Sequence, residues 1–271
     1  MRVSHLYPLS RRLLGLASLL ALLCGAARSA TPSADDSNAP TTVAEQYLLS
    51  AANQERAARG LQPLHRDPQL AQAAAQHARK MAEHGTISHQ FPGEAELTDR
   101  GAAVGVSFSV IAENVGEAPS VVKIHDLWMH SEHHRANLLD PSVDSAGISV
   151  IASGEELYAV EDFAKTVRSV RLEDQESTIA NLIAGSGNVY LASGRDAIAD
   201  ARQTCALGTG YAGTRKPWFV MRFTSDSLNQ LPDVLKTRLA SGRYHQAAVG
   251  ACPSDRQSPF TSYSFAVLLY P

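Results

Sequence analysis

Apolar residues recur every three or four positions in three segments of the first half of the chain, and this spacing predicts three helices. The first covers residues 43–59. The second begins at the N-cap Asp67 and ends before Gly85, and the third begins after the N-cap Ser120. Trp128 lies on the apolar stripe of the third helix, so we expect it to anchor the core rather than form a ligand platform.

Strand spacing follows these helices. Residues 146–152 and 157–164 alternate apolar and polar side chains, which predicts a half-buried antiparallel hairpin. Glu113 lies before the third helix, in a segment that we interpret as a short turn. Residues 130–134 are expected to run off the C-terminal end of the third helix. The sequence thus predicts an α+β unit over residues 43–166.

The second half of the chain, from residue 167, has a different sequence pattern. Its helix-then-hairpin ending loosely resembles the end of the first unit, but no polar signature repeats. We therefore expect an unrelated α+β extension over residues 167–271 rather than a degenerate second copy. The predicted helices cover residues 170–185, 193–205 and 226–241, and the predicted strands cover residues 188–192, 218–224, 247–252 and 263–270.

The N-terminus has the composition of an export signal. Three arginines precede an apolar run over residues 13–23, and small residues follow it, which predicts a signal peptide over residues 1–29. The run is shorter than the roughly 20 residues of a membrane span. Residues 30–42 are expected to form a flexible leader. Lipidation at Cys24 is an alternative, although no small residue precedes it. We expect a secreted or periplasmic protein whose mature chain has no transmembrane span.

Charge and cysteine content narrow the functional classes. The formal net charge is −3, and loss of residues 1–29, with four arginines and no acid, lowers it to −7. Nucleic-acid binding is excluded, because it needs clustered Lys and Arg. If Cys24 leaves with the signal peptide, Cys205 and Cys252 remain and are expected to form a disulfide in an oxidising compartment. Two unpaired buried thiols are the alternative.

Three short polar signatures supply His89, Glu113 and His134. Two imidazoles and one carboxylate suit Zn²⁺ or another divalent metal, with an open position for water. Without a metal, a His–Glu pair could transfer protons near neutral pH. A purely structural hydrogen-bond cluster is the third interpretation. His77, on the second predicted helix, is expected to be a hydrogen-bonded core or cleft residue rather than a ligand.

Taken in this order, the signatures resemble the CAP superfamily (cysteine-rich secretory protein, antigen 5, pathogenesis-related 1) in its short bacterial form. The resemblance covers residues 43–165 and implies an α-β-α sandwich with a central cleft lined by His89, Glu113 and His134. The family's second acidic residue corresponds to Ser131, so the implied set of four is incomplete and metal binding would be weak. The matching motifs are Ser88-His89, Glu113-Asn114, and His134-Arg135-Ala136-Asn137, with His133 where the bacterial pattern has glycine.

The resemblance implies binding of a small apolar or lipid-like ligand, or of a cell-envelope component, in this cleft, and we expect this rather than catalysis. A metal-assisted, peptidase-like hydrolase is the alternative, but no nucleophile-elbow or oxyanion motif accompanies Ser88 or Ser131. An extracellular adhesion or interaction module is the third possibility. Its contact surface would be the aromatic and basic segment 211–222, although Trp218 is predicted to lie in a buried strand.

Overall fold

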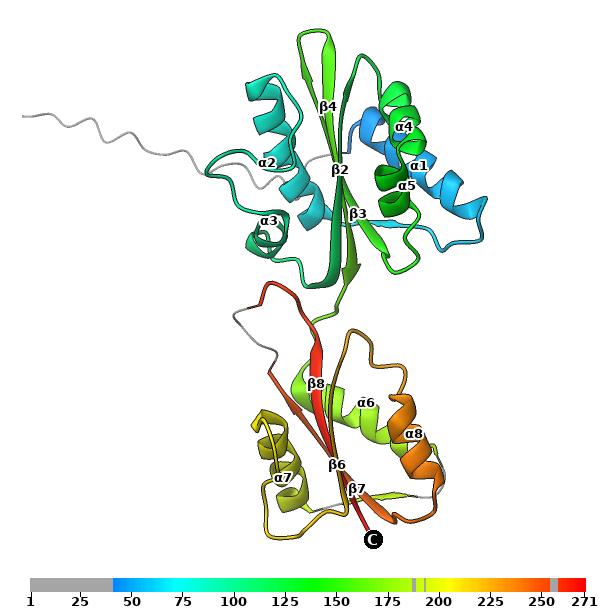
Figure 1. Cartoon of the computed structure of the whole chain (residues 1–271), viewed down its shortest axis with the longest axis vertical. Coiled ribbons are helices and arrows are strands. Elements are labelled where there is room, and N and C mark those ends of the chain that lie inside the picture. Colours follow the sequence, from blue (N-terminus) through cyan, green and yellow to red (C-terminus); the bar gives the residue numbers. More distant parts are fainter. Residues whose placement is uncertain (1–40, 187–188, 193, 254–257) are drawn as a thin grey trace, which may run out of the picture. The chain divides into compact units, whose positions relative to one another are not determined.

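The computed structural model describes residues 41–186, 189–192, 194–253 and 258–271. The predicted signal peptide and nearly all of the predicted leader lie outside these residues, so both stay predictions. None of the helices in the described ranges is long and apolar enough to cross a membrane. The fold is α+β, with two four-stranded sheets that are each covered by helices (Figure 1).

The first sheet and its helices form three layers, which we call the N-terminal sandwich. The strand order is β1-β3-β4-β2; β1 runs parallel to β3, and the other pairs are antiparallel. Helices α2 and α3 cover one face, and α1, α4 and α5 cover the other (Figure 1). The elements are α1 (Val43–Ala57), β1 (His65–Arg66), α2 (Pro68–His84), α3 (Leu97–Ala103), β2 (Phe108–Ala118), α4 (Val121–His130), α5 (Glu132–Leu138), β3 (Ser145–Ser153) and β4 (Glu156–Thr166).

The predicted helix boundaries are confirmed by their caps. The side chain of Asp67 accepts hydrogen bonds from two backbone amides in the first turn of α2, and Ser120 accepts one in α4. Gly85 ends α2 with φ of +63°, a left-handed conformation that glycine adopts without strain. Thr42 begins α1 with a reciprocal capping box to Glu45.

The core of this sandwich lies on both faces of the sheet. Trp128 is fully buried and its indole N–H donates to the carbonyl of Val115 at 2.8 Å, so it anchors the core as predicted. On the other face, Gly147 of β3 lies against α2. A Cβ atom there would be 2.1 Å from the backbone of Leu70, so only glycine lets α2 approach β3 this closely.

Two predictions in this half were wrong. Glu113 lies in the long strand β2, not in a turn. The strand was not recognised from the sequence because polar side chains lie on both of its faces at this point, so the alternation of apolar and polar residues is lost. The chain also does not run off after His130: Ser131 ends α4 and α5 begins at Glu132. Helix α5 has no side-chain cap, and its buried Leu138 joins the core, so tertiary packing rather than a local signal stabilises it.

The second sheet and its helices form the C-terminal sandwich. The strand order is β5-β7-β8-β6, with a parallel pair at one edge and antiparallel pairs elsewhere. Helices α6 and α8 pack on one face and α7 on the other. The elements are α6 (Leu172–Ala184), β5 (Tyr190–Leu191), α7 (Arg195–Ala206), β6 (Phe219–Ser225), α8 (Asp233–Ala240), β7 (Gln246–Cys252) and β8 (Tyr263–Tyr270).

The C-terminal sandwich repeats the topology of the N-terminal one. Both have the same strand order, and their helices and strands follow one another in the same order along the chain, except that α3 and α5 have no counterpart in the C-terminal sandwich. Gly250 in β7 lies as close to the backbone of α7 as Gly147 in β3 lies to that of α2, with a notional Cβ 2.2 Å away. The expectation of an unrelated module is therefore corrected in favour of a degenerate copy. Separation of the two into independent domains at residue 166 stays a prediction.

Three further expectations for this half are decided. Cys205 and Cys252 form the predicted disulfide, which joins α7 to β7. The helix predicted over residues 226–241 is shorter and begins only after Pro232, because the preceding residues form bends and irregular structure. Trp218 is not buried: it precedes β6 and is 60% exposed.

Candidate functional site

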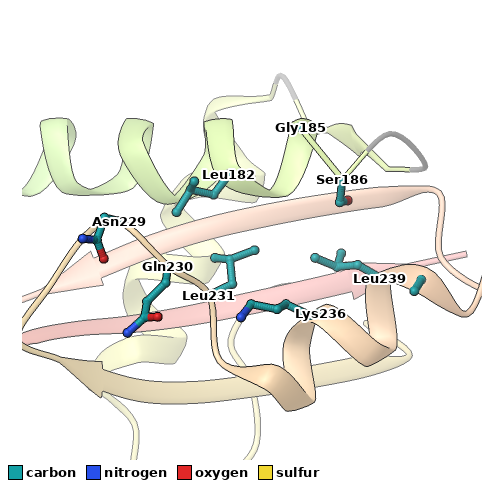
Figure 2. Close-up of a pocket in the computed structure, with 9 residues that line it drawn as sticks. Leu182, Gly185, Ser186, Asn229, Gln230, Leu231, Lys236 and Leu239 are labelled. Atoms are coloured by element: carbon teal, nitrogen blue, oxygen red, sulfur yellow. The ribbon is translucent and has the colours of Figure 1, made fainter.

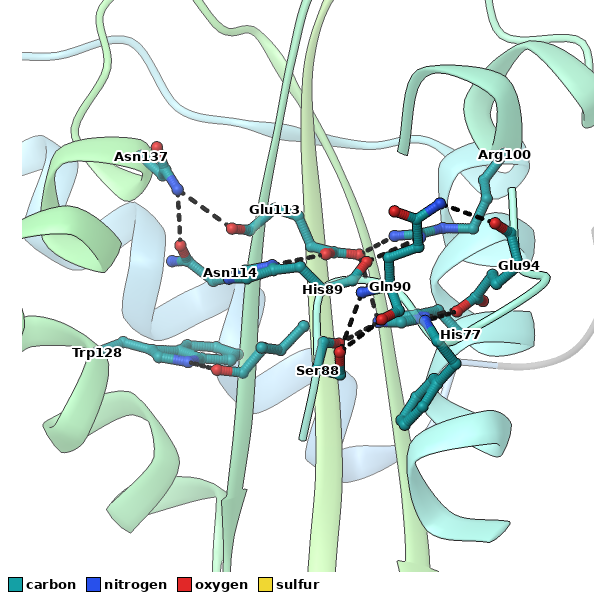
Figure 3. Close-up of polar contacts among 12 residues, drawn as sticks. His77, Ser88, His89, Gln90, Glu94, Arg100, Glu113, Asn114, Trp128 and Asn137 are labelled. Atoms are coloured by element: carbon teal, nitrogen blue, oxygen red, sulfur yellow. Dashed lines mark hydrogen bonds and ion pairs between the residues drawn. The ribbon is translucent and has the colours of Figure 1, made fainter. Parts of the chain in front are cut away.

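The polar residues of the three signatures meet around the edge strand β2 (Figure 3). Glu113 and its neighbour Asn114 point to opposite faces of this strand, as alternation requires. Glu113 faces α2, and Asn114 faces α5. His89 comes from the loop after α2, and His134 from α5.

Glu113 is the centre of the arrangement and is almost completely buried. Its Oε1 is 2.9 Å from Nδ1 of His89, and its Oε2 forms an ion pair with a guanidinium nitrogen of Arg100. Arg100 is itself buried and also donates to the carbonyl of His89 at 3.1 Å. A buried carboxylate needs such a partner to remain charged. Sequence reasoning missed Arg100, which lies in α3, because no recognised motif surrounds it.

His77 lies behind Glu113, as a buried hydrogen-bonded residue, which confirms its predicted role. Its Nε2 is 2.6 Å from the carbonyl of Ser88 and its Nδ1 is 3.0 Å from Oε1 of Glu94. The carbonyl of Ser88 can only accept, so Nε2 of His77 donates to it. Burial raises the pKa of Glu94, but hydrogen bonds from His77 and from the amide of Phe91 lower it below its usual value.

The pKa values of the two signature histidines shift in opposite directions. The hydrogen bond to Glu113 raises the pKa of His89, against the opposing effect of burial. Burial lowers the pKa of His134, and the positive charges of His89 and His133 lower it further. The His134 ring makes no hydrogen bond to Glu113 in the part of the chain that the structure describes. The structure thus joins His89 to Glu113 directly and places His134 within the electrostatic reach of His89.

Two asparagines tie α5 to the edge strand. Asn137 donates to the carbonyl of Glu113 at 3.2 Å and to the side-chain oxygen of Asn114 at 3.0 Å. Asn114 in turn donates to the carbonyl of His134 at 3.0 Å, which fixes the backbone of α5 rather than the imidazole. The amides in the second and third signatures therefore position the site.

Comparison with known proteins bears on this geometry. Residues 49–164 match the family model described as CAP, the cysteine-rich secretory protein family. This segment is a CAP domain. It is similar to the uncharacterized protein YkwD of Bacillus subtilis, with 29% identity over 120 residues, which are 43% of this chain and 47% of that protein. The chain thus spans about half the length of that curated relative.

Two solved bacterial structures also resemble the chain. An extracellular protein containing an SCP domain, from Bacillus anthracis, is 26% identical; the likeness covers 47% of this chain and 45% of that one, with a TM-score of 0.42. An outer surface protein of Borrelia burgdorferi is 22% identical; the likeness covers 47% of this chain and 96% of that one, with a TM-score of 0.44.

The CAP domain also buries two carboxyl groups that sequence reasoning missed. Glu161 and Asp162 point to opposite faces of the central strand β4, and neither carboxyl has a hydrogen-bond partner among the described residues. Burial raises the pKa of Glu161 to about 8. Burial, and then the charge of its cross-strand neighbour Glu113, raises the pKa of Asp162 well above its usual range. The carboxyl of Glu161 is therefore mostly protonated at neutral pH.

The predicted metal ligands do not come together as a metal site. Among the described residues, no group of three or more His, Cys, Asp or Glu side chains is placed to hold a metal ion. Both oxygens of Glu113 and one nitrogen of His89 are already engaged. Ser131 joins α4 to α5 and supplies no carboxylate. The residues of the CAP domain therefore do not fit a zinc centre.

Proposed function

We propose that the CAP domain is a binding module that acts outside the cytoplasm. In this proposal, the His89, Glu113 and His134 face holds the polar group of a small apolar or lipid-like molecule of the cell envelope. The observation that carries it is the fixed but accessible His89 ring. Its Nδ1 is held by the buried Glu113–Arg100 pair, while 62% of the side chain remains exposed for a ligand.

The hydrogen bonding of the serines near the histidines favours a binding function over covalent catalysis. The Ser88 hydroxyl donates to the carbonyl of Gln90 at 2.7 Å and so is turned to its own loop. Within the described residues, no serine hydroxyl is hydrogen-bonded to His89 or His134, which a nucleophile–base pair would require. The disulfide between Cys205 and Cys252 supports an extracytoplasmic location, because disulfides persist in oxidising compartments.

The test is a lipid-extraction assay with the mature chain and envelope lipids. We expect His89→Ala and His134→Ala to lose extraction, because each removes a polar contact at the proposed face. His130→Ala is the matched control, since His130 is an exposed histidine that is paired to Asp126 on α4. Equal extraction by all four proteins would sink the proposal, provided that circular dichroism shows intact folds.

A hydrolase is the second candidate, and the His89–Glu113 hydrogen bond is the observation that favours it. A carboxylate on Nδ1 orients an imidazole and raises its basicity, so that Nε2 could take a proton from water. We expect no cleavage of a peptide library by the mature chain. Cleavage that disappears in His89→Ala and in Glu113→Gln would instead favour the hydrolase.

A further inference from the structure

A pocket in the C-terminal sandwich lies outside the site described above (Figure 2). Its volume is about 470 Å³, and it opens between α6, α8 and the segment that leads into α8. This size is within the range of roughly 300 to 1,000 Å³ that is typical of small-molecule sites. The lining residues are Leu182, Gly185, Ser186, Asn229, Gln230, Leu231, Lys236, Leu239 and Ala240.

The comparison of the two sandwiches gives a physical reason for the pocket. In the N-terminal sandwich, the equivalent layer contains α4 with the indole of Trp128, followed by α5 with Leu138. In the C-terminal sandwich, α8 is two residues shorter than α4, with eight residues against ten. Residues 241–245, all of them described, lead from it to β7 without a second helix. The layer is therefore covered less completely.

The chemistry of the lining is amphipathic. Leu182, Leu231 and Leu239 form an apolar floor, and the amides of Asn229 and Gln230 lie at one end (Figure 2). Lys236 is the one ionisable side chain among the nine lining residues, and no acid lines the pocket.

The counter-charge of Lys236 lies outside the lining. Its ammonium group pairs with Asp233 at 2.9 Å, but Asp233 is 96% exposed. Such a surface pair contributes little free energy, typically below about 1 kcal/mol, so an anionic ligand can compete with Asp233 for the ammonium group.

We propose that this pocket binds a small amphipathic anion. Its apolar body lies on the three leucines, and its carboxylate, sulfonate or phosphate group meets Lys236 and accepts hydrogen bonds from Asn229 and Gln230. This site is separate from the proposed function of the CAP domain: it uses none of the same residues, so either proposal can fail alone.

The experiment measures fluorescence of 1-anilinonaphthalene-8-sulfonate, an aromatic anion, with the full mature chain. We expect saturable binding that Lys236→Gln weakens about tenfold, the cost of losing one charge-assisted hydrogen bond. Asp233→Asn should strengthen binding, because it removes the competing carboxylate. Lys123→Gln is the matched control: Lys123 forms the same kind of i,i+3 pair on α4, the equivalent helix. It should change nothing.

Two further arms separate charge from apolar contact. Leu182 is only partly buried, so Leu182→Trp can fill the pocket without disturbing the core, and it should abolish binding. 4-Phenylbutyrate should displace the probe, and 4-phenylbutanol, its neutral analogue, should not at equal concentration. Absence of binding in the parent chain would overturn the proposal. So would equal effects of Lys236→Gln and Lys123→Gln, unchanged binding in Leu182→Trp, or equal displacement by the alcohol.

Discussion

Glu161 makes the stability of the CAP domain dependent on pH in an unusual direction. Its side chain is buried between the cross-strand neighbours Asn114 and Ile148, with 1% of the residue exposed. Burial raises its pKa from 4.5 to about 8. In the unfolded chain the group ionises at its ordinary pKa. Between these two values, the folded protein therefore holds a proton that the unfolded chain has released.

The sign and magnitude follow from proton linkage. Where the folded state binds more protons than the unfolded state, the free energy of unfolding falls as pH rises. Each pH unit in this window costs about 1.4 kcal/mol, so between pH 5 and pH 8 Glu161 alone removes about 4 kcal/mol. Glu161→Gln keeps the shape of the side chain and cannot ionise, so this part of the pH dependence should disappear.

The assay is urea unfolding at pH 5 and at pH 8, followed by tryptophan fluorescence. The chain has two tryptophans, so both proteins should carry Trp218→Phe, which leaves the buried Trp128 as the reporter of the CAP domain. We expect Glu161→Gln to gain about 4 kcal/mol relative to its parent on going from pH 5 to pH 8. A constant difference between the two proteins at both pH values would refute the reasoning, because it would show that Glu161 does not titrate in this window.

Three more predictions follow from single contacts. Arg100→Ala should destabilise the CAP domain by about 3 to 5 kcal/mol in thermal or urea unfolding, because it leaves a buried carboxylate without its cation; a loss below about 1 kcal/mol would contradict the buried pair. In NMR titrations the pKa of His134 should rise when His89 is replaced by Ala, since a neighbouring positive charge is removed; an unchanged value would place the two rings apart. Gly250→Ala should unfold the C-terminal sandwich at lower urea than the parent, since its Cβ meets helix backbone, whereas Gly194→Ala, in open space, should not.

Much of the fold could be predicted because its signals are local. The cap at Asp67, the glycine at Gly85 and the alternating hairpin of β3 and β4 each depend on residues close in sequence, and each was confirmed. The strand β2 was missed because its centre carries Glu113-Asn114, whose burial depends on partners far along the chain. Hydrophobic periodicity identifies a strand by its apolar face, and at Glu113-Asn114 both faces of β2 are polar.

The candidate site was predicted in part for the same reason. His89 and Glu113 belong to recognisable signatures, and the structure brings them into contact. Arg100 and Asp162 belong to none, although they border Glu113 on two sides. A buried charge requires a partner, but the sequence does not say which of the chain's 24 lysines and arginines supplies it. Only the packing of α3 beside β2 selects Arg100.

A second copy of the fold was considered from the sequence and rejected, because the position of the site carries a different residue there. In the CAP domain, Gly147, against which α2 packs, is paired across the sheet with Asp162, and Asp162 is paired with Glu113. In the C-terminal sandwich, Gly250, against which α7 packs, is paired with Ala266, and Ala266 is paired with Arg222.

Arg222 thus takes the place of Glu113 and reverses its charge. Its Nε donates to the carbonyl of Thr204 at 2.8 Å and its Nη2 to that of Gly210 at 2.6 Å, so it caps the end of α7. A guanidinium group held by these two carbonyls is positioned without a histidine or carboxylate, because carbonyl oxygens accept from two of its N–H groups. The polar signatures that mark the CAP domain are therefore unnecessary in the copy. The topology persists through the glycine and the apolar faces, which periodicity alone cannot connect to a family.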